Sequence, residues 1–427
     1  MSAGATAALP DACGIDFGTS NSTAACALAG ASGPVTLLPL EDGRPTLPSV
    51  VFFHAADAHI SYGRAALADY LAGDEGRLMR SMKSLLGSAM IDEQTEVAGR
   101  ALPFRALLAQ FIGELKRRAE HAAGRPFTRA VLGRPVFFVD GDAAADRVAE
   151  NTLAEIARAT GLKNIAFQYE PIAAAFDYEM QVRREELVLV ADIVGGTSDF
   201  ALVRLAPERA GRADRREDIL ASSGVHIGGT DFDKHLSLAS VMPMLGLGSQ
   251  LRSGLLMPSA PYFRLSTWHT INHAYTKKSW AQIGDLHREA QEKDKLERLK
   301  KLVSERAGHW LAMQVEEAKI ALSAAAETHM DLGRIAPGER LPMTRAGFDA
   351  AILPLVDEVA QSVAGLLREA GVAASAVDTV LFTGGSSSVP LLRERIAALL
   401  PQARRVEGDL FGSIGTGLAL DALRKFG

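Results

Sequence analysis

Apolar and polar positions alternate along the chain in a way that predicts strands, turns and helices. Residues 187–205 hold a β-branched apolar run, then Asp192, a glycine turn and a second apolar run, which predicts a hairpin. Residues 13–28 repeat this order, with Asp16 ahead of the turn. Further apolar runs predict strands at 35–38, 129–138 and 164–167. Two similar hairpins in one chain indicate a duplicated unit.

Helical periodicity appears between these strands. It predicts helices at 63–86, 102–120 and 143–160, and Pro171 favours a helix that starts at Glu170. The stretch 264–336 contains no proline and predicts long amphipathic helices. Residues 377–401 are typical of a strand, a glycine turn and a helix, and 408–420 of a small-residue helix that can pack closely. We therefore expect an α/β protein.

Composition narrows the class of protein. The 427 residues are 48% hydrophobic and 23% charged, as in a soluble globular protein with two lobes. Because 46 basic side chains face 51 acidic ones, we expect no dedicated nucleic-acid surface. No apolar run approaches the roughly 20 residues of a membrane span, and the first dozen residues lack the pattern of a secretory signal. With only two cysteines, a cytoplasmic protein is expected.

The two glycine turns are candidates for phosphate binding. Glycines let successive backbone N–H groups approach one phosphate, and carboxylates such as Asp16, Asp192 and Asp199 can hold a hard cation beside it. An ordinary glycine hairpin is the alternative for either turn alone. The recurrence of the pattern favours a phosphate held between two halves.

Other residues admit two interpretations from the sequence alone. Lys83 is either a solvated lysine at a helix end or part of the site, and Glu170 is either a helix cap or a catalytic group. Glu316, Lys319 and Ser323 share one helical face, which lines a groove or decorates a surface. The turn 384–386 precedes a helix, an arrangement that can hold a nucleotide.

Seven motifs together carry a family resemblance. GIDFGTSNS, EPIAAAFDYE, VLVADIVGGTSDF, GGTDFD, EEAKIALS, LFTGGSSSVP and FGSIGTGLA occur in the order of the actin-like ATPase superfamily. The chain most resembles the nucleotide-binding domain of DnaK-type heat-shock chaperones, in the YegD-like branch. The resemblance implies two lobes with duplicated ribonuclease-H-like βββαβα cores. They would be residues 1–186 with an insert at about 46–117, residues 187–405 with a helical insert at about 229–353, and a helix at 406–427 returning to the first lobe.

The resemblance also implies a site for ATP or ADP with Mg²⁺. Asp16 and Asp192 would hold the metal through its waters. Residues expected to act in hydrolysis are Lys83, Glu170, Asp192, Thr197 and Asp199. Residues expected to bind the nucleotide are Asp16, Gly18, Thr19, Ser20, Asn21, Gly195, Gly196, Gly228, Gly229, Glu316, Lys319, Ser323, Gly384, Gly385 and Ser386.

Three residues depart from the chaperone pattern. Val194 replaces the first of three glycines, and Ile320 and Ser388 replace two arginines of the adenosine motif. We therefore expect weaker or less adenine-selective binding. The linker and peptide-binding domain of full-length chaperones are also expected to be absent, since only ten residues follow Gly417.

The implied function is slow ATP hydrolysis that controls the closure of the two lobes, read out by an unidentified protein partner or client. No nucleic-acid or membrane partner is expected. A sugar-type small-molecule kinase and a nucleotide-dependent actin-like assembly protein are the alternatives on the same fold.

Overall fold

The computed structural model describes residues 10–28, 33–56, 59–97, 100–212 and 214–427. Most of the N-terminal stretch considered as a signal sequence therefore lies outside the described residues. The chain forms two compact units. The first unit comprises Met1–His226, Val359–Ser387 and Arg393–Gly427, and the second unit comprises Ile227–Glu358 and Ser388–Leu392.

The first unit holds a six-stranded and a five-stranded sheet, and the five main strands of each have the same topology. The sixth strand of the first sheet, β4 (Leu47–Pro48), pairs with β2. In one sheet the order is β11-β10-β1-β2-β3, and in the other it is β14-β13-β12-β17-β18. In each sheet three antiparallel strands are extended by two strands that run parallel to the first. The five main strands of the first sheet are β1 (Ala12–Asp16), β2 (Asn21–Cys26), β3 (Thr36–Leu37), β10 (Arg129–Arg134) and β11 (Asn164–Tyr169). Those of the second are β12 (Glu186–Ile193), β13 (Ser198–Leu205), β14 (Ile219–Val225), β17 (Thr379–Thr383) and β18 (Arg404–Glu407).

Helices occupy matching places after these strands. The helices are α2 (Phe104–Ala123), α3 (Ala143–Ala159) and α4 (Glu170–Glu179) around the first sheet, and α10 (Arg345–Glu369), α11 (Pro390–Leu399) and α12 (Ser413–Phe426) in the second half. Each half thus reads βββ, helix, strand, helix, strand, helix. This order confirms the predicted α/β class of an actin-like ATPase with duplicated cores.

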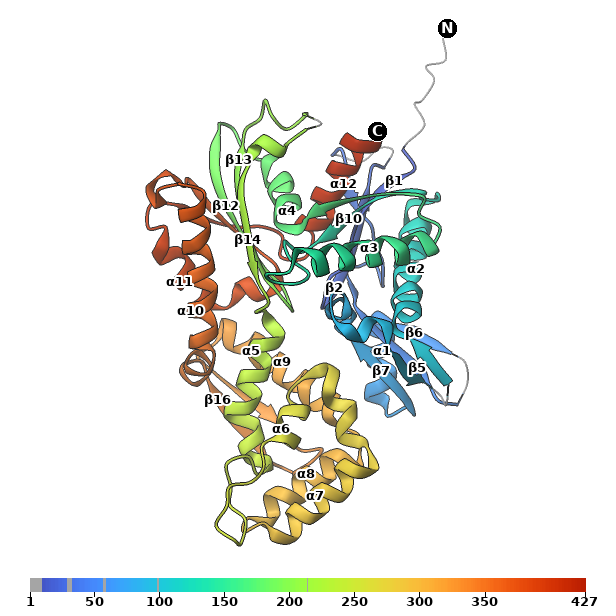
Figure 1. The fold of residues 1–427 in the computed structure, drawn as a ribbon, viewed down its shortest axis with the longest axis vertical. Coiled ribbons are helices and arrows are strands. Elements are labelled where there is room, and N and C mark those ends of the chain that lie inside the picture. The colour runs from blue at the N-terminus through green and yellow to red at the C-terminus, as the bar shows by residue number, and fades with distance from the viewer. Residues whose placement is uncertain (1–9, 29–32, 57–58, 98–99, 213) are drawn as a thin grey trace. The chain divides into compact units, whose positions relative to one another are not determined.

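The helices α4 and α12 pack against each other between the two sheets of the first unit (Figure 1). Small residues allow this close approach. A Cβ atom at Gly417 would overlap the carbonyl of Ala173 in α4, and one at Gly14 would overlap the backbone of α12. The predicted close packing of the last helix is confirmed.

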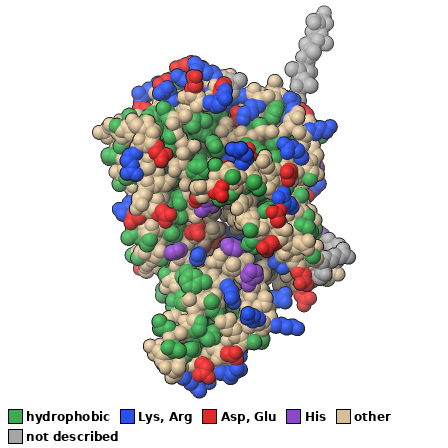
Figure 2. Space-filling model, viewed as in Figure 1, with side chains coloured by type: hydrophobic (Ala, Val, Ile, Leu, Met, Phe, Trp, Pro, Cys, Tyr) green, Lys and Arg blue, Asp and Glu red, His purple; other side chains and the backbone are tan. Residues whose placement is uncertain are grey.

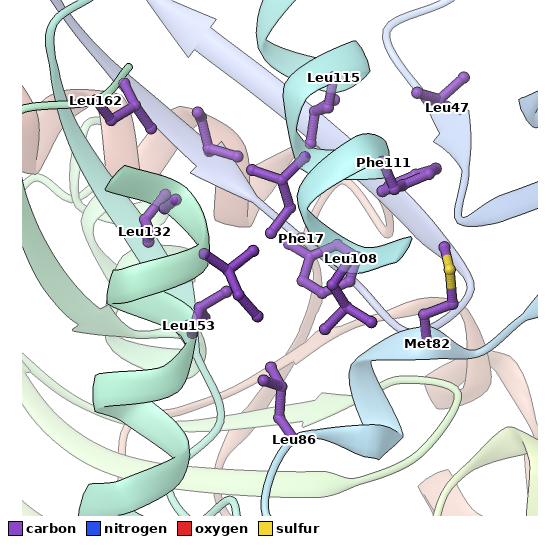
Figure 3. Close-up of a cluster of buried hydrophobic side chains, with 14 of the residues drawn as sticks. Phe17, Leu47, Met82, Leu86, Leu108, Phe111, Leu115, Leu132, Leu153 and Leu162 are labelled. Carbon is purple, nitrogen blue, oxygen red and sulfur yellow. The ribbon is translucent and has the colours of Figure 1, made fainter. Parts of the chain in front are cut away.

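The apolar core of the first half gathers side chains from distant segments (Figure 3). Phe17, Met82 and Leu108 belong to one buried cluster, together with Leu132 and Leu153. Met82 comes from a 3₁₀ turn, η1 (Met82–Leu85). The core therefore fixes this turn near the end of β1.

A small sheet and a helix lie between β3 and α2. The elements of this segment are β4 (Leu47–Pro48), β5 (Val50–His54), β6 (Ile60–Tyr62), α1 (Gly63–Ala72), β7 (Gly76–Arg80), η2 (Ala89–Asp92), β8 (Gln94–Val97) and β9 (Arg100–Pro103). Strands pair in the order β6-β5-β7.

The second unit is mainly helical, with one two-stranded sheet. It contains α5 (Gly229–Leu236), α6 (Ala260–Leu265), α7 (Lys277–Glu289), α8 (Lys293–Ser304), α9 (Gly308–Ala324), β15 (Glu327–Asp331) and β16 (Arg340–Thr344), and α10 begins in it. Shorter helical turns in the chain are η3 (Arg216–Asp218), η4 (Ser237–Val241), η5 (Met242–Leu245), η6 (Trp268–Tyr275), η7 (Ala374–Ala376) and η8 (Gly385–Ser388).

Three predicted element boundaries are wrong. The helix predicted at 63–86 ends at Ala72, where Gly73 adopts a left-handed conformation, and a strand follows. The strand predicted to Phe138 ends at Arg134, before Pro135, which lacks the N–H that a ladder requires. The helices predicted through 336 end at Ala324, because residues 327–331 pair with β16.

One described helix, α10, has the length and apolar composition that could cross a membrane, contrary to the sequence expectation that no such run exists. Of the 18 consecutive residues that make up its most apolar part, 33% are buried. Phe348, Ile352, Val356, Val359 and Val363 are 0% exposed and recur every three or four positions, as in a core helix. One such helix is weak evidence for a membrane span.

On the face shown in Figure 2, acidic and basic side chains are interspersed.

Candidate functional site

The first strand of each sheet carries an aspartate at its end. Asp16 is the last residue of β1 and is 7% exposed, while Asp192 is the next-to-last residue of β12 and is 0% exposed. Apolar residues precede both, so each strand is buried up to the point where its glycine turn begins. The duplicated topology therefore places the two carboxylates at equivalent positions.

The two glycine turns meet each other. A Cβ atom at Gly195 would overlap the Oγ of Ser20, and one at Gly196 would lie 3.3 Å from the Oγ1 of Thr19. The turn at Gly18 is held by Ser49, whose Oγ donates to the Gly18 carbonyl over 2.7 Å. Asn21 begins the strand that follows. The structure thus brings together the hairpins that the sequence placed far apart.

Val194 does not prevent the second turn from closing. Its N–H donates to the carbonyl of Thr197 over 3.0 Å. The departure from three glycines is therefore accommodated in the backbone of the hairpin.

Lys83 and Glu170 form a buried ion pair between the Lys83 Nζ and the Glu170 Oε1. Their side chains are only 7% and 1% exposed, so Lys83 is not a solvated surface lysine. Its neighbours Met82 and Leu85 are buried in the core and hold the turn in place. Burial works to lower the pKa of Lys83, but the carboxylates of Glu170 and Asp16 outweigh burial and raise it.

Glu170 is the first residue of α4, as predicted, but its carboxylate does not cap the helix. The cap position is Tyr169, with no side-chain hydrogen bond, and Pro171 occupies the first turn. The carboxylate is bonded to Lys83 instead. Glu170 therefore lies in the first turn, where its charge suits the helix dipole, and its carboxylate is hydrogen-bonded to Lys83 and not to the helix end.

Asp199 is the second residue of β13, the second strand of its hairpin, and completes the acidic cluster. Its Oδ1 accepts the backbone N–H of Val136 over 2.7 Å, and its Oδ2 has no hydrogen-bond partner. Burial, reinforced by Glu170, raises the pKa of Asp199 to about 7, although a hydrogen bond from Thr197 favours the ionised form. Asp199, Thr197 and the β10–α3 loop thus meet at this point.

The acidic cluster contains more carboxylates than positive groups. Burial raises the pKa of Asp16 to about 7, with the Glu170 carboxylate adding to the effect and Lys83 opposing it. Burial and the neighbouring carboxylates also raise the pKa of Asp192 well above its ordinary value. Four carboxylates, those of Asp16, Glu170, Asp192 and Asp199, therefore share one ammonium.

Neither carboxylate oxygen of Asp192 has a hydrogen-bond partner, although the side chain is fully buried. Unpaired buried carboxylates are costly, and a divalent cation would satisfy them. Oxygen ligands of this kind suit Mg²⁺, which keeps several of its waters. The residues present therefore fit a magnesium site at Asp16 and Asp192.

A third turn adjoins Asp192. Gly384 follows β17 with a φ of 77°, and a Cβ atom there would lie 2.9 Å from the Oδ1 of Asp192. The Ser387 Oγ donates to the Gly384 carbonyl over 2.7 Å and closes the turn that contains Gly385 and Ser386. The predicted adenosine turn thus lies beside the second glycine hairpin.

Five predicted site residues lie in the second unit: Gly228, Gly229, Glu316, Lys319 and Ser323. The Lys319 Nζ lies 2.9 Å from Asp233 Oδ1 and 3.3 Å from the Gly229 carbonyl. The Ser323 Oγ donates to the carbonyl of Lys319 over 3.0 Å, and Glu316 is half-buried on the same helix. Lys319 is therefore a buried link between α9 and the start of α5. Participation of these residues in one site with the carboxylates stays a prediction.

The sequence analysis missed Arg134, which is 7% exposed at the end of β10. Its guanidinium lies over the rings of Phe138 and Tyr169, at 5.0 and 5.2 Å from their centroids. It donates to the Val136 carbonyl over 3.2 Å. It also pairs with Asp146, at 2.7 Å, and Glu150 in α3.

Arg134 thereby joins two parts of the site. Val136 supplies the N–H that Asp199 accepts, and Tyr169 directly precedes Glu170. A charged residue at the end of an apolar strand, just before a proline, was the available signal in the sequence.

Two comparisons place the chain among known proteins. A model of the family described as "Hsp70 protein" matches residues 12–241 and 284–420. The chain is also 27% identical over 438 residues to "Chaperone protein HscA" of Klebsiella pneumoniae (strain 342). The same protein of Klebsiella pneumoniae subsp. pneumoniae matches at the same identity. Each alignment covers 96% of this chain and 58% of the relative, so the chain spans less than two thirds of the relatives' length.

Proposed function

The chain belongs to the Hsp70 family, and on that premise we propose that it binds ATP with Mg²⁺ and hydrolyses it slowly as a chaperone-like nucleotide switch. One observation carries this proposal most directly. Four buried carboxylates and one lysine gather where two glycine turns meet, and the Asp192 oxygens lack any hydrogen-bond partner. Such a cluster is suited to a metal-bound phosphate. The metal would balance the carboxylates, and the phosphate oxygens would accept hydrogen bonds from the glycine turns.

The turns would hold the phosphates. Gly195 and Gly196 lie against the hydroxyls of Ser20 and Thr19, and their backbone N–H groups together with these hydroxyls would supply donors for phosphate oxygens. Asp16 and Asp192 would hold Mg²⁺ through its waters. When bound, the metal would neutralise charge on the phosphate oxygens.

Lys83 and the acidic residues would position the attacking water. The Lys83 ammonium is fixed by Glu170 and offsets negative charge at the γ-phosphate. Asp199, held by Val136, and Thr197 complete the polar shell around that water. Phosphoryl transfer depends on in-line positioning and charge neutralisation, so no covalent nucleophile is required.

The proposed function also includes an adenosine site and a protein partner. Gly384, Gly385 and Ser386, with Glu316, Lys319 and Ser323, would hold the adenosine. The relatives are named as chaperones, and we propose by that likeness an unidentified protein partner or client. We also propose a cytoplasmic location, with nucleotide-dependent lobe closure as the signal.

Release of inorganic phosphate from ATP, with no added acceptor, tests this function. We expect slow release that depends on Mg²⁺, with no increase in light scattering. Phosphate transfer only to an added sugar would instead indicate a kinase. Scattering that rises with ATP would indicate an assembly protein.

A further inference from the structure

A second group of metal-ligating side chains lies in the small β6-β5-β7 sheet and its helix α1. His54 Nε2 is 3.1 Å from Asp69 Oδ2, and His54 Nδ1 is 3.8 Å from Asp74 Oδ2. One ligand atom from each residue lies within 4.8 Å of the other two. None of these residues belongs to the proposed nucleotide site.

The local fold explains why these three side chains converge. His54 is the last residue of β5, where it pairs with Gly76 of β7. Asp69 lies near the end of α1, and Gly73 closes the helix with a φ of 90°. The N–H of Asp74 then donates to the carbonyl of Asp69 over 3.2 Å. This helix end turns two aspartates, five positions apart, towards one imidazole.

Neighbouring residues fix the orientation of the group. The Ser61 hydroxyl is 5% exposed, lies 2.9 Å from His54 Nε2 and is bonded to Asp69 Oδ2. The edge of Phe52 packs on His54, with ring centroids 4.7 Å apart, and the ring of His59 lies 5.0 Å away. Hydroxyl and ring contacts of this kind orient ligands before a metal arrives.

The charge and donor types point to a transition metal. Two carboxylates beside one imidazole leave an excess of negative charge, which a divalent cation would neutralise. Imidazole nitrogen with carboxylate oxygens is a donor set that Zn²⁺ uses at sites with three protein ligands. Zinc bonds of about 2.0–2.2 Å place neighbouring ligands about 3.4 Å apart. The ligand atoms lie within 4.8 Å of one another, so the group contracts by at most about 1.4 Å. The half-exposed Asp74 can move to provide this contraction.

We propose that His54, Asp69 and Asp74 bind one divalent transition-metal ion, with Zn²⁺ as the best match, and leave a coordination position open to water. Asp69 and His54 are the fixed ligands because Ser61 and Phe52 hold them. Asp74, whose side chain is 49% exposed, is the ligand that closes on the ion. This proposal does not rest on the nucleotide chemistry.

Isothermal titration of the full chain with zinc chloride tests the proposal. The protein is first stripped with a chelator, and excess Mg²⁺ is kept present so that zinc does not report on the nucleotide site. We expect saturable uptake of one zinc ion. Asp74→Asn should weaken it by about 10- to 100-fold, a loss typical of disturbed metal sites, and His54→Ala should abolish it. Asp74 is exposed enough that its variant folds normally.

His226→Ala is the matched control. His226 Nδ1 lies 2.7 Å from Asp140 Oδ2, but that exposed pair has one carboxylate in place of two. This variant should bind zinc as the parent does. Absence of saturable uptake, or equal loss in the Asp74 and His226 variants, would overturn the site. In that case His54 would serve only as an ion-pair partner of the two aspartates.

Discussion

At the scale of single residues, the Lys83–Glu170 pair joins segments 87 positions apart inside the acidic cluster. Lys83→Ala should lower single-turnover ATP hydrolysis by about 10²–10³-fold, because it removes one fixed electrostatic contribution near the γ-phosphate. Nucleotide binding should survive, since the glycine turns remain. Rapid-quench hydrolysis beside equilibrium binding measures both.

The same variant leaves Glu170 buried without a partner, which typically costs about 3–5 kcal/mol of stability. Adding Glu170→Gln should recover much of that stability but not the turnover. Lys163→Ala, at an exposed lysine, is the control and should change neither. Turnover that returns together with stability in the double variant would show that Lys83 acts only in folding.

Ile320 gives a prediction about base selectivity. Its side chain is 61% exposed on α9, where the chaperone pattern has an arginine. Affinities for ATP and GTP should therefore be similar. Ile320→Arg should raise ATP affinity by about 10-fold, a cation–π contribution of about 1–2 kcal/mol. Leu353→Arg, at an exposed leucine of α10, is the control for added charge. Strong ATP selectivity in the parent chain would contradict this reading of the base site.

The sequence identified the candidate site residues more successfully than it predicted which groups surround them. Asp16, Asp192 and the glycine turns have local signatures, because an aspartate and a turn follow an apolar strand. Whether Lys83 is buried depends on Met82 and Leu85 entering a core formed by distant segments. No local pattern records that packing, so the sequence left two interpretations open.

At the scale of elements, the contact between α12 and α4 depends on a missing side chain. Gly417→Ala would overlap the Ala173 carbonyl and should destabilise the protein by about 1–3 kcal/mol, as overpacking does. Gly365→Ala in α10 meets no atom within 4 Å and should stabilise by about 0.5–1 kcal/mol. Chemical denaturation of both variants checks the signs. Equal effects would mean that α12 adjusts without cost.

Arg134 holds the β10–α3 loop against Tyr169 and is expected to act as a positioning residue. Arg134→Met should lower the kcat for ATP hydrolysis by about 10-fold or more while the KM for ATP changes little, since small displacements of polar groups slow reactions sharply. Arg134→Lys should recover only part, because lysine lacks the planar fork that bridges Asp146 and Glu150.

Arg117→Met, at an exposed arginine paired with Glu114, is the control for charge loss. A rise in KM with unchanged kcat in the Arg134→Met variant would show that the loop binds nucleotide and does not position the reacting groups.

Element prediction succeeded where caps and turns mark both ends of a segment. The helix α3 matches its prediction within one residue, because Asp142 caps its start and Gly161 follows its end. It failed at β7 and β15, whose strands exist only through pairing with β5 and β16. Such short strands receive their conformation from the partner strand, so helical periodicity in the sequence was misleading.

At the scale of the whole molecule, duplication explains why the site has two aspartates and two glycine turns. Each half contributes a β-hairpin of the same topology, and both hairpins belong to the first compact unit. The predicted boundary between two lobes at residues 186 and 187 stays a prediction. Binding of Mg²⁺ with ATP is the central claim, because the charge of the cluster is otherwise unbalanced.

Titration of ATP into the parent chain and into Asp192→Asn, each with and without Mg²⁺, tests this claim most directly. Burial disfavours the ionised Asp192, so the asparagine variant should be folded and no less stable at pH 7. We expect Mg²⁺ to strengthen ATP binding in the parent and to have little effect in the variant. Equal Mg²⁺-dependent affinity in the two proteins would contradict the claim.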